Sequence, residues 1–453
     1  MPKPVMVSVS GIRGIVGDGL SPDLVARYSA AAGTLTGPGE VMVGRDSRVT
    51  GPMVMHAVFS GLMSVGCHPV DLGLVPTPTV QLATEKSDAV GGIVITASHN
   101  PVEWNALKLL GRDGLFLDEH EGAEVKRIVE QGRFRFVPWD AVGRQSARSG
   151  AVEDHIRAVL AIPFVDVEAV RRRGFRVAYD CVNGAGGVLL PGLLSRLGCE
   201  AFPIHAEPHG RFAHAPEPVA ANLADLCRLV REHRADIGFA VDPDADRLAV
   251  VAETGQAIGE EYTVTLAVRF ILSKRNGRVA VNISTTRAVD DVAKASGAEV
   301  IRTPVGEIHV AKKMREIKAS IGGEGNGGVI LPDVHLGRDA AVGVALILQQ
   351  LLESGGTLSA LWKSLPQYTM VKKKMETGRL DPDGILRRFE EKHLHERIDR
   401  TDGLKIERPE GWVQVRKSNT EPIIRVMAEA KTARAAEELC DSFLRDIKGL
   451  LHS

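Results

Sequence analysis

Short apolar runs alternate with amphipathic stretches along most of the chain, and one arrangement of them occurs three times. The three copies begin with apolar runs at residues 41–43, 177–180 and 279–282. Each copy continues as a helical stretch, a glycine, a second apolar run, another helical stretch and a third apolar run. Apolar runs separated by helical patterns are typical of α/β units. The pattern therefore predicts three similar mixed α/β domains.

The chain changes its pattern after about Tyr368. From there it reads strand, helix over residues 381–393, strand, loop, strand and a final helix over residues 432–451. Apolar side chains recur at helical spacing in the final segment, for example at Leu439 and Phe443. This predicts a fourth, different domain at the C-terminal end.

Candidate boundaries fall where polar residues and glycine interrupt these patterns. They lie near residues 148–150, 253–255 and 364–366. The four expected domains are residues 1–149, 150–254, 255–366 and 367–453.

Composition excludes several classes of partner. The 453 residues contain 56 Lys and Arg against 57 Asp and Glu, a balance that gives no electrostatic footprint for nucleic acid or an anionic membrane. Five widely spaced cysteines without a C-x-x-C pair fit a reducing compartment. We see neither a signal-peptide pattern nor an apolar run of membrane-spanning length. These features predict a cytoplasmic protein without nucleic-acid or membrane partners; an oligomer is possible, but no feature predicts one.

A polar turn follows the third apolar run of the first copy. It reads Thr-Ala-Ser-His-Asn-Pro over residues 96–101 and places Ser98 beside His99. Reactive side chains often lie on loops at strand ends, because a rigid sheet holds them in place. An ordinary turn capped by Ser, Asn and Pro explains this segment equally well on its own.

Three aspartates at alternate positions follow the corresponding run of the second copy: Asp242, Asp244 and Asp246. Alternation along a strand end would place their carboxylates on one face, where they repel unless a cation lies between them. Hard oxygen ligands suit Mg²⁺ or Ca²⁺, and we expect Mg²⁺ with a phosphate oxygen as a further ligand. A solvated acidic turn is the plainer alternative, but the apolar runs on both sides favour a packed location.

The corresponding run of the third copy ends in a glycine-rich segment, residues 322–328. The glycines superficially match a dinucleotide-binding fingerprint, but Pro332 follows where such a site needs a helix. We instead expect a loop that offers Glu324 and Asn326 to sugar hydroxyls.

Anion donors are concentrated at three other places. Arg13 lies among glycines near the start of the chain and Lys108 follows the Ser98 turn; without context, both would be assigned to surface charge. A denser set lies between the last two predicted strands and suits a phosphate monoester, although an exposed polar turn is the alternative there. Its members are Arg416, Ser418, Asn419, Thr420 and Arg425.

Together these segments resemble one family, the α-D-phosphohexomutases, over essentially the whole chain. Residues 96–101 are similar to the family's phosphoserine loop and residues 242–247 to its magnesium loop. Residues 323–326 are similar to its sugar-binding loop and residues 416–425 to its phosphate-binding loop. Four motifs in the family's order make the resemblance specific.

The resemblance implies a fold and a reaction. Three similar α/β domains and a fourth, TATA-binding-protein-like α+β domain would surround a central cleft. Phosphate would move reversibly between O6 and O1 of a hexose phosphate, through phosphorylated Ser98 and a bound hexose 1,6-bisphosphate. Phosphoryl transfer depends mainly on positioning and charge neutralisation, which the implied Mg²⁺ and basic residues would supply.

The resemblance also assigns roles to individual residues. Ser98 is expected to react, assisted by Arg13, Lys108 and His99. The expected metal ligands are Ser98, Asp242, Asp244 and Asp246. The substrate is expected to contact Arg247, Thr303, Gly306, Glu307, Glu324 and Asn326. The expected phosphate-binding residues are Arg416, Ser418, Asn419, Thr420 and Arg425.

Departures from the common bacterial pattern bear on the substrate. Asn326 stands where many bacterial members carry Ser, and residues 335–339 look like the archaeal-type branch of the family. An acidic Glu307 in the segment similar to the specificity loop favours an ammonium group, which favours glucosamine phosphate. A phosphomannomutase/phosphoglucomutase of broad specificity is the main alternative. A metal-dependent sugar-phosphate phosphatase and a non-catalytic sugar-phosphate binder are the others.

Overall fold

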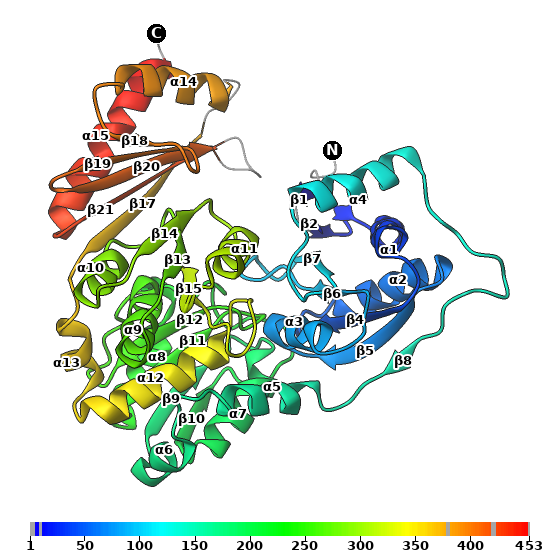
Figure 1. Ribbon diagram of the computed structural model, residues 1–453, viewed down its shortest axis with the longest axis horizontal. Coiled ribbons are helices and arrows are strands. Elements are labelled where there is room, and N and C mark those ends of the chain that lie inside the picture. The colour runs from blue at the N-terminus through cyan, green and yellow to red at the C-terminus, as the bar shows by residue number, and fades with distance from the viewer. Residues whose placement is uncertain (1–4, 9–10, 377–380, 418–422, 452–453) are drawn as a thin grey trace.

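The computed structural model describes residues 5–8, 11–376, 381–417 and 423–451, which form four sheets (Figure 1). The first domain contains an eight-stranded sheet. Its strands are β1 (Met6–Ser8), β2 (Gly11–Val16), β3 (Gly19–Leu20), β4 (Glu40–Arg45), β5 (His68–Leu74), β6 (Gly91–Ile95), β7 (Trp104–Gly111) and β8 (Ser146–Ala147). Its helices are α1 (Pro22–Thr36), α2 (Gly51–Ser64), α3 (Thr77–Glu85) and α4 (Glu119–Gln131).

The second and third domains each contain a four-stranded sheet. The elements of the second are α5 (Ala151–Leu160), α6 (Val167–Arg173), β9 (Arg176–Asp180), α7 (Gly186–Arg196), β10 (Glu200–Ile204), the 3₁₀ turn η1 (Ala220–Asn222), α8 (Ala224–Glu232), β11 (Ile237–Val241) and β12 (Leu248–Ala252). Those of the third are α9 (Glu260–Lys274), β13 (Val279–Asn282), α10 (Ala288–Ala295), β14 (Val300–Thr303), α11 (Glu307–Ile317), β15 (Ile321–Glu324), β16 (Gly328–Ile330), α12 (Ala340–Ser354) and α13 (Leu358–Lys363).

The predicted threefold repeat is present in the strand order. The arrangement β5-β4-β6-β7 of the first sheet recurs as β10-β9-β11-β12 and as β14-β13-β15-β16. In each copy the first three strands are parallel and the fourth is antiparallel to its neighbour. The loop after the third strand therefore leaves the same edge of each sheet. These are the loops that carry Ser98, the three aspartates and Glu324.

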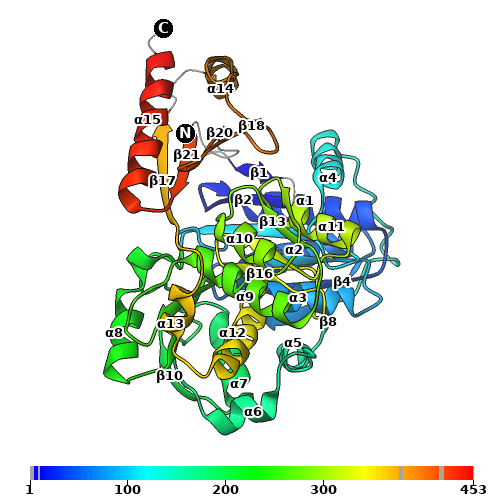
Figure 2. The same cartoon turned by 60° about the vertical axis from the view of Figure 1, so that its left-hand side comes forward.

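The fourth domain is an antiparallel sheet in the order β17-β21-β20-β19-β18 with two helices packed on it (Figure 2). Its elements are β17 (Thr369–Glu376), α14 (Pro382–Lys392), β18 (Ile398–Asp399), β19 (Leu404–Arg408), β20 (Gly411–Lys417), β21 (Ile423–Ala430) and α15 (Ala433–Leu451). Helices were predicted at the positions of α14 and α15. The four sheets fall one into each predicted segment, and the end points of those segments stay predictions.

Apolar strands and one apolar helix build the centre of the molecule. Every residue of β6, β11 and β12 is buried, as expected for strands covered on both faces. Helix α12 is apolar around most of its circumference, and its buried residues belong to a cluster that spans residues 156–365. The second and third domains therefore share one continuous core.

The fourth domain has an apolar cluster of its own. Among the described residues, all members of this cluster lie between positions 371 and 447. Hydrogen bonds join this domain to the third. Lys405 Nζ donates to the carbonyl of Ile283 (3.0 Å), and Ser284 Oγ donates to Gln414 Oε1 (2.6 Å). The backbone N–H of Val305 donates to Asp402 Oδ2 (3.0 Å). The contact between these two domains is thus rich in polar groups.

None of the helices in the described parts of the chain is both long enough and apolar enough to span a bilayer.

Candidate active site

Ser98 lies directly beyond β6 in a strained and tightly held loop. It is 3% exposed, and its backbone has a φ of 48°, in the left-handed region that non-glycine residues rarely adopt. The fully buried Arg48 holds this conformation, because its guanidinium donates to the carbonyls of Ser98 (2.6 Å) and Asn100 (2.7 Å). Arg48 also pairs with Asp46 (3.1 Å). The loop therefore presents Ser98 in one fixed orientation.

The hydroxyl of Ser98 faces the second domain. Its Oγ donates to Asp242 Oδ2 at 2.8 Å, which joins two loops 144 positions apart in the sequence. The Nδ1 atom of His99 lies 3.5 Å from the same Oγ, at the outer limit of a hydrogen bond. The nearby Arg247 cation, burial and Arg13 lower the pKa of His99 well below its usual value, which favours a neutral imidazole.

The three aspartates come together through a turn. Asp242, Asp244 and Asp246 are each fully buried, and one carboxylate oxygen from each lies within 4.8 Å of the others. The expected strand alternation is wrong, because β11 ends at Val241 and the aspartates lie in the turn before β12. Ala245, with a φ of 52°, reverses the chain there. The turn and not the strand pleat places the carboxylates on one side.

Asp244 and Asp246 each have one carboxylate oxygen that accepts a hydrogen bond and one that does not in the described chain, although Asp246 Oδ1 lies 3.7 Å from Arg247 Nε. Asp244 Oδ2 accepts hydrogen bonds from Lys108 Nζ (2.6 Å) and Thr77 Oγ1 (2.6 Å), and Asp246 Oδ2 accepts one from Arg338 Nη2 (2.6 Å). The Oδ1 atoms of Asp244 and Asp246 are buried without a hydrogen-bond partner in the described part of the chain. Buried oxygens of this kind are rare unless an ion or water satisfies them. The donor set fits a hard divalent cation.

Burial and the neighbouring Asp244 and Asp246 raise the pKa of Asp242 well above its usual value. Burial acts in the same direction on Asp244, but the Lys108 ammonium and hydrogen bonds with Asp242, Lys108 and Thr77 together outweigh it and lower the pKa of that carboxyl. The surrounding protein therefore keeps Asp244 ionised more strongly than Asp242.

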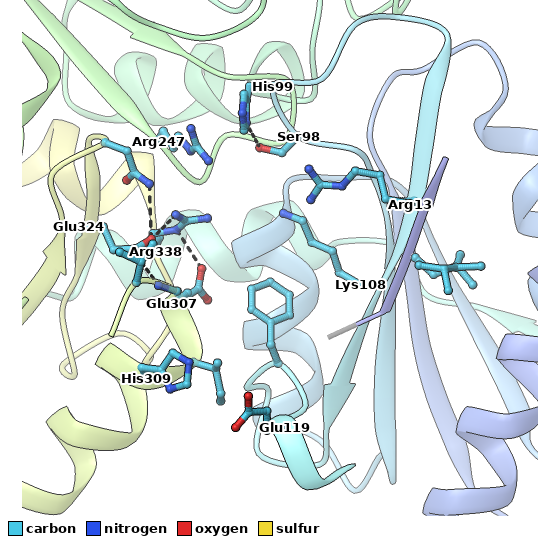
Figure 3. Close-up of a pocket in the computed structure, with 18 of the residues that line it drawn as sticks. Arg13, Ser98, His99, Lys108, Glu119, Arg247, Glu307, His309, Glu324 and Arg338 are labelled. Atoms are coloured by element: carbon cyan, nitrogen blue, oxygen red, sulfur yellow. Dashed lines mark hydrogen bonds and ion pairs between the residues drawn. The ribbon is translucent and has the colours of Figure 1, made fainter. Parts of the chain in front are cut away.

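A cavity of about 570 Å³ opens in front of Ser98 (Figure 3). Arg13 and Lys108 project from the first domain on one wall, with Ser98 and His99 beside them. The opposite wall is formed by residues of the second and third domains. Those named earlier as candidates are Arg247, Gly306, Glu307, Glu324 and Asn326. The cavity is thus lined by cations near Ser98, and by two carboxylates and two guanidiniums across from it, since Arg338 also belongs to the lining.

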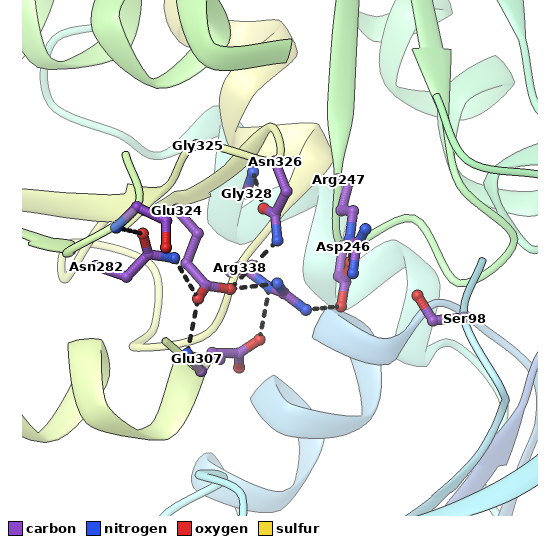
Figure 4. A network of polar contacts seen from close by, with 12 residues as sticks. Ser98, Asp246, Arg247, Asn282, Glu307, Glu324, Gly325, Asn326, Gly328 and Arg338 are labelled. Atoms are coloured by element: carbon purple, nitrogen blue, oxygen red, sulfur yellow. Dashed lines mark hydrogen bonds and ion pairs between the residues drawn. The ribbon is translucent and has the colours of Figure 1, made fainter. Parts of the chain in front are cut away.

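The carboxylates of the opposite wall converge on Arg338 (Figure 4). Glu307 Oε2 accepts from Arg338 Nε at 3.0 Å, and its Oε1 accepts from Gln81 Nε2 at 2.7 Å. Glu324 Oε2 pairs with Arg338 Nη1, while its Oε1 accepts from Asn282 Nδ2 (2.8 Å).

Other candidates lie elsewhere. Thr303 is buried, and its hydroxyl donates to the carbonyl of Pro304 (2.9 Å); it does not line the cavity. Arg416 and Arg425 are register partners on β20 and β21, and neither belongs to the described lining of the cavity. Ser418, Asn419 and Thr420 lie outside the described residues.

Two buried arginines were missed from the sequence. Arg48 holds the Ser98 loop, and Arg338 joins the two sides of the site. Arg48 comes two residues after Asp46, and Arg338 comes directly before Asp339. Each arginine lies in the polar segment that follows an apolar run. An arginine beside an aspartate in such a position is the one signal that could have indicated a buried ion pair.

Comparison with known proteins identifies the class. The chain matches the four domains described as phosphoglucomutase/phosphomannomutase: alpha/beta/alpha domain I over residues 5–136, domain II over 153–255, domain III over 259–368 and the C-terminal domain over 370–445. The chain belongs to the α-D-phosphohexomutase family and is an isomerase of the phosphohexomutase type.

Individual relatives cover almost the whole chain. A Methanopyrus kandleri protein named "Probable phosphoglucosamine mutase" is 40% identical over 442 residues, which are 96% of each chain. A Thermococcus kodakarensis protein named "Phosphoglucomutase/phosphomannomutase" is 40% identical over 94% of this chain and 95% of its own. A crystal structure of a phosphoglucomutase/phosphomannomutase family protein from Burkholderia thailandensis superposes with a TM-score of 0.87 at 26% identity, covering 98% of this chain and 97% of that one.

Proposed function

We propose that this phosphohexomutase transfers phosphate between O6 and O1 of a glucosamine phosphate, with Ser98 as the residue that carries the phosphate. The observation that carries this proposal is the Ser98 hydroxyl, held 2.8 Å from Asp242 at one side of a cavity whose other side presents Glu307 and Glu324. A phosphoryl group on Ser98 Oγ would face the cavity between the cations Arg13 and Lys108.

The chemistry requires two transfers that mirror each other. A substrate hydroxyl attacks the phosphorus on Ser98, the bond from Ser98 Oγ to phosphorus breaks, and the hydroxyl proton passes to a nearby base. Neutral His99 is a group near Ser98 that could accept this proton, and the Lys108 ammonium could supply the proton that Ser98 Oγ takes up as its bond to phosphorus breaks. The bound 1,6-bisphosphate then turns and returns its other phosphate to Ser98 Oγ. Arg13 and Arg247 hold the negative charge during both steps.

Asp242, Asp244 and Asp246 would hold Mg²⁺, with an oxygen of phosphorylated Ser98 as a further ligand. The bound ion would neutralise charge on the phosphoryl group. The Oδ1 atoms of Asp244 and Asp246 support this role, because they are buried and lack hydrogen-bond partners in the described chain. Lys108 and Thr77 orient the carboxylate of Asp244.

The two glutamates of the opposite wall support an amino sugar. Glu307 and Glu324 each accept hydrogen bonds from the protein, but a carboxylate offers about four acceptor positions and keeps some for a ligand. A sugar ammonium is a donor that suits two neighbouring carboxylates. The relative named "Probable phosphoglucosamine mutase" agrees with this substrate. The equally similar relative named "Phosphoglucomutase/phosphomannomutase" favours broad specificity as the second candidate.

A mutase assay with glucosamine, mannose and glucose phosphates side by side tests the substrate. Glu307→Gln removes one negative charge at nearly constant shape, and we expect it to lower kcat/KM for glucosamine phosphate by about tenfold. The values for mannose and glucose phosphates should change much less. The ratio between sugars is the measured quantity, because it cancels any general damage to the site. Equal wild-type rates on all three sugars, or an unchanged ratio in the variant, would favour broad specificity.

Arg416 is proposed to bind the phosphate that is not being transferred. Arg416 lies on β20, and its Nε lacks a hydrogen-bond partner in the described chain. Burial and the nearby Arg425 lower the pKa of Arg416, while Asp402 acts in the opposite direction. We expect Arg416→Ala to raise KM about tenfold or more, with a smaller change in kcat, because a charge-assisted phosphate contact is lost.

Steady-state kinetics at saturating Mg²⁺ measures this effect. Arg434→Ala is the matched control, since Arg434 lies on α15 of the same domain with an 89% exposed side chain. An unaltered KM in Arg416→Ala would contradict the phosphate-binding role.

A further inference from the structure

Arg338 is the most highly connected cation beside the cavity. Its guanidinium contacts three buried carboxylates from three different segments of the chain: Asp246 (2.6 Å), Glu307 (3.0 Å) and Glu324 (Figure 4). Asp246 belongs to the aspartate turn of the second domain, and the two glutamates belong to the third. Burial alone would lower the pKa of Arg338, but these carboxylates outweigh it and raise that pKa well above its usual value.

The surrounding chain fixes the position of the Arg338 side chain. A Cβ atom at Gly328 would lie 2.2 Å from Arg338 Cδ, so only glycine leaves room for the arginine stem. The next residue, Asp339, caps α12 by accepting from the backbone N–H of Ala341 (2.8 Å). Asp339 also accepts from two buried imidazoles, His155 (2.7 Å) and His335 (3.2 Å). Arg338 is therefore held from both sides before any ligand arrives.

The three contacts of Arg338 have unequal consequences for their partners. Glu307 and Glu324 use their second oxygens in hydrogen bonds to the protein, as described above. Asp246 does not: its Oδ2 accepts from Arg338 and also lies 3.6 Å from Lys108 Nζ, while its Oδ1 lies 3.7 Å from Arg247 Nε and has no hydrogen bond in the described chain. A donor that holds one oxygen of a carboxylate orients the other, which is how neighbouring groups tune metal ligands. Arg338 thus orients the carboxylate of Asp246, as Lys108 and Thr77 orient the carboxylate of Asp244.

We propose that Arg338 is a positioning residue that couples the aspartate turn to the sugar side of the cavity, by sharing one guanidinium between Asp246 and Glu324. The proposal rests on the metal and sugar roles proposed above. A ligand that draws Glu324 away from Arg338 strengthens the ion pair between Arg338 and Asp246. A cation bound at Asp246 weakens that ion pair and strengthens the one between Arg338 and Glu324. Occupation of either side therefore changes affinity at the other, and the effect is reciprocal.

A double-mutant cycle on Mg²⁺ affinity tests this coupling without relying on turnover. Titration calorimetry with MgCl₂ alone would be run on the wild type, Glu324→Gln, Arg338→Lys and the double variant. Arg338→Lys keeps the charge but loses the planar, three-way contact. We expect it to weaken Mg²⁺ binding by about tenfold or more, the usual effect of losing a partner of a metal ligand. Glu324→Gln should weaken Mg²⁺ binding about threefold in the wild-type background and leave it unchanged in the Arg338→Lys background.

Arg275→Lys is the matched control. Arg275 lies in the same domain and pairs with Asp333 (3.0 Å) away from the main cavity, so its replacement should not change the Mg²⁺ affinity. Equal effects of Glu324→Gln in both backgrounds would overturn the coupling. If Arg338→Lys does not fold, an unchanged Mg²⁺ affinity in Glu324→Gln alone overturns it as well.

The outcomes also separate this inference from the proposed function. A wild type that does not bind Mg²⁺ would remove the metal assignment itself, and the inference with it. A wild type that binds Mg²⁺ and interconverts hexose phosphates, combined with an Arg338→Lys variant of equal Mg²⁺ affinity, would overturn the inference alone.

Discussion

Replacement of Ser98 by alanine is expected to abolish interconversion of hexose phosphates, with a fall in kcat on the order of 10,000-fold or more. Alanine removes the only atom of this side chain that can form a phosphate ester. The fold should persist, because the backbone conformation at φ 48° is held by Arg48 through the carbonyls of Ser98 and Asn100. These contacts involve no Ser98 side-chain atom.

Two measurements separate chemistry from folding in the Ser98→Ala variant. Phosphorylated peptide mapping after incubation with glucose 1,6-bisphosphate should find phosphate on the wild type and none at position 98 of the variant. Thermal melting should be close to that of the wild type. Ser87→Ala is the control, since Ser87 lies on the loop after α3 and its hydroxyl makes only local hydrogen bonds in the described chain: it donates to the carbonyl of Thr84 (3.1 Å) and accepts from the backbone N–H of Ala89 (3.3 Å). A variant that retained full activity would exclude Ser98 as the phosphate carrier.

Replacement of Asp244 by asparagine is expected to weaken Mg²⁺ binding and to lower kcat by about 100-fold or more. The change removes one of the charges that face the cation. It also leaves Lys108, whose pKa Asp244 and Asp246 raise against burial, with a neutral amide at its closest contact. Activity should recover only in part at high Mg²⁺ concentration.

Calorimetry with MgCl₂ and the Mg²⁺ dependence of kcat measure the two effects of Asp244→Asn. Asp236→Asn is a matched control, because Asp236 precedes the opposite end of β11 and pairs with Arg173 (3.0 Å) at the surface. The control should change neither quantity. An unchanged Mg²⁺ dependence in Asp244→Asn would remove Asp244 from the metal site.

The sequence was informative wherever a site depends on a short segment. The three loops that leave equivalent strands could be located from their apolar runs, and the structure brings Ser98 within 2.8 Å of Asp242 as a consequence of the repeat. The backbone conformation of these loops was harder to predict from the sequence. The aspartates were expected on a strand, but Ala245 at φ 52° makes a turn that no hydrophobic pattern indicates. Left-handed backbone at an alanine depends on tertiary contacts and not on propensity.

Residues that act across the sequence were harder to predict. Arg338 contacts Asp246 from 92 positions away, and Arg48 contacts Ser98 from 50 positions away. An isolated arginine is most often a surface residue, so only the folded chain distinguishes these two from exposed charges. Their importance comes from burial, which makes each contact with a carboxylate or carbonyl costly to lose.

The separate core of the fourth domain has a consequence for which domains can move apart. Moving this domain away from the third would break hydrogen bonds such as Lys405 to Ile283 and Ser284 to Gln414, and water can replace each of them. It would leave the domain's own apolar cluster intact. The second and third domains cannot separate in this way, because their common core would be exposed to solvent. Separating the fourth domain from the third is therefore far less costly than separating the second domain from the third.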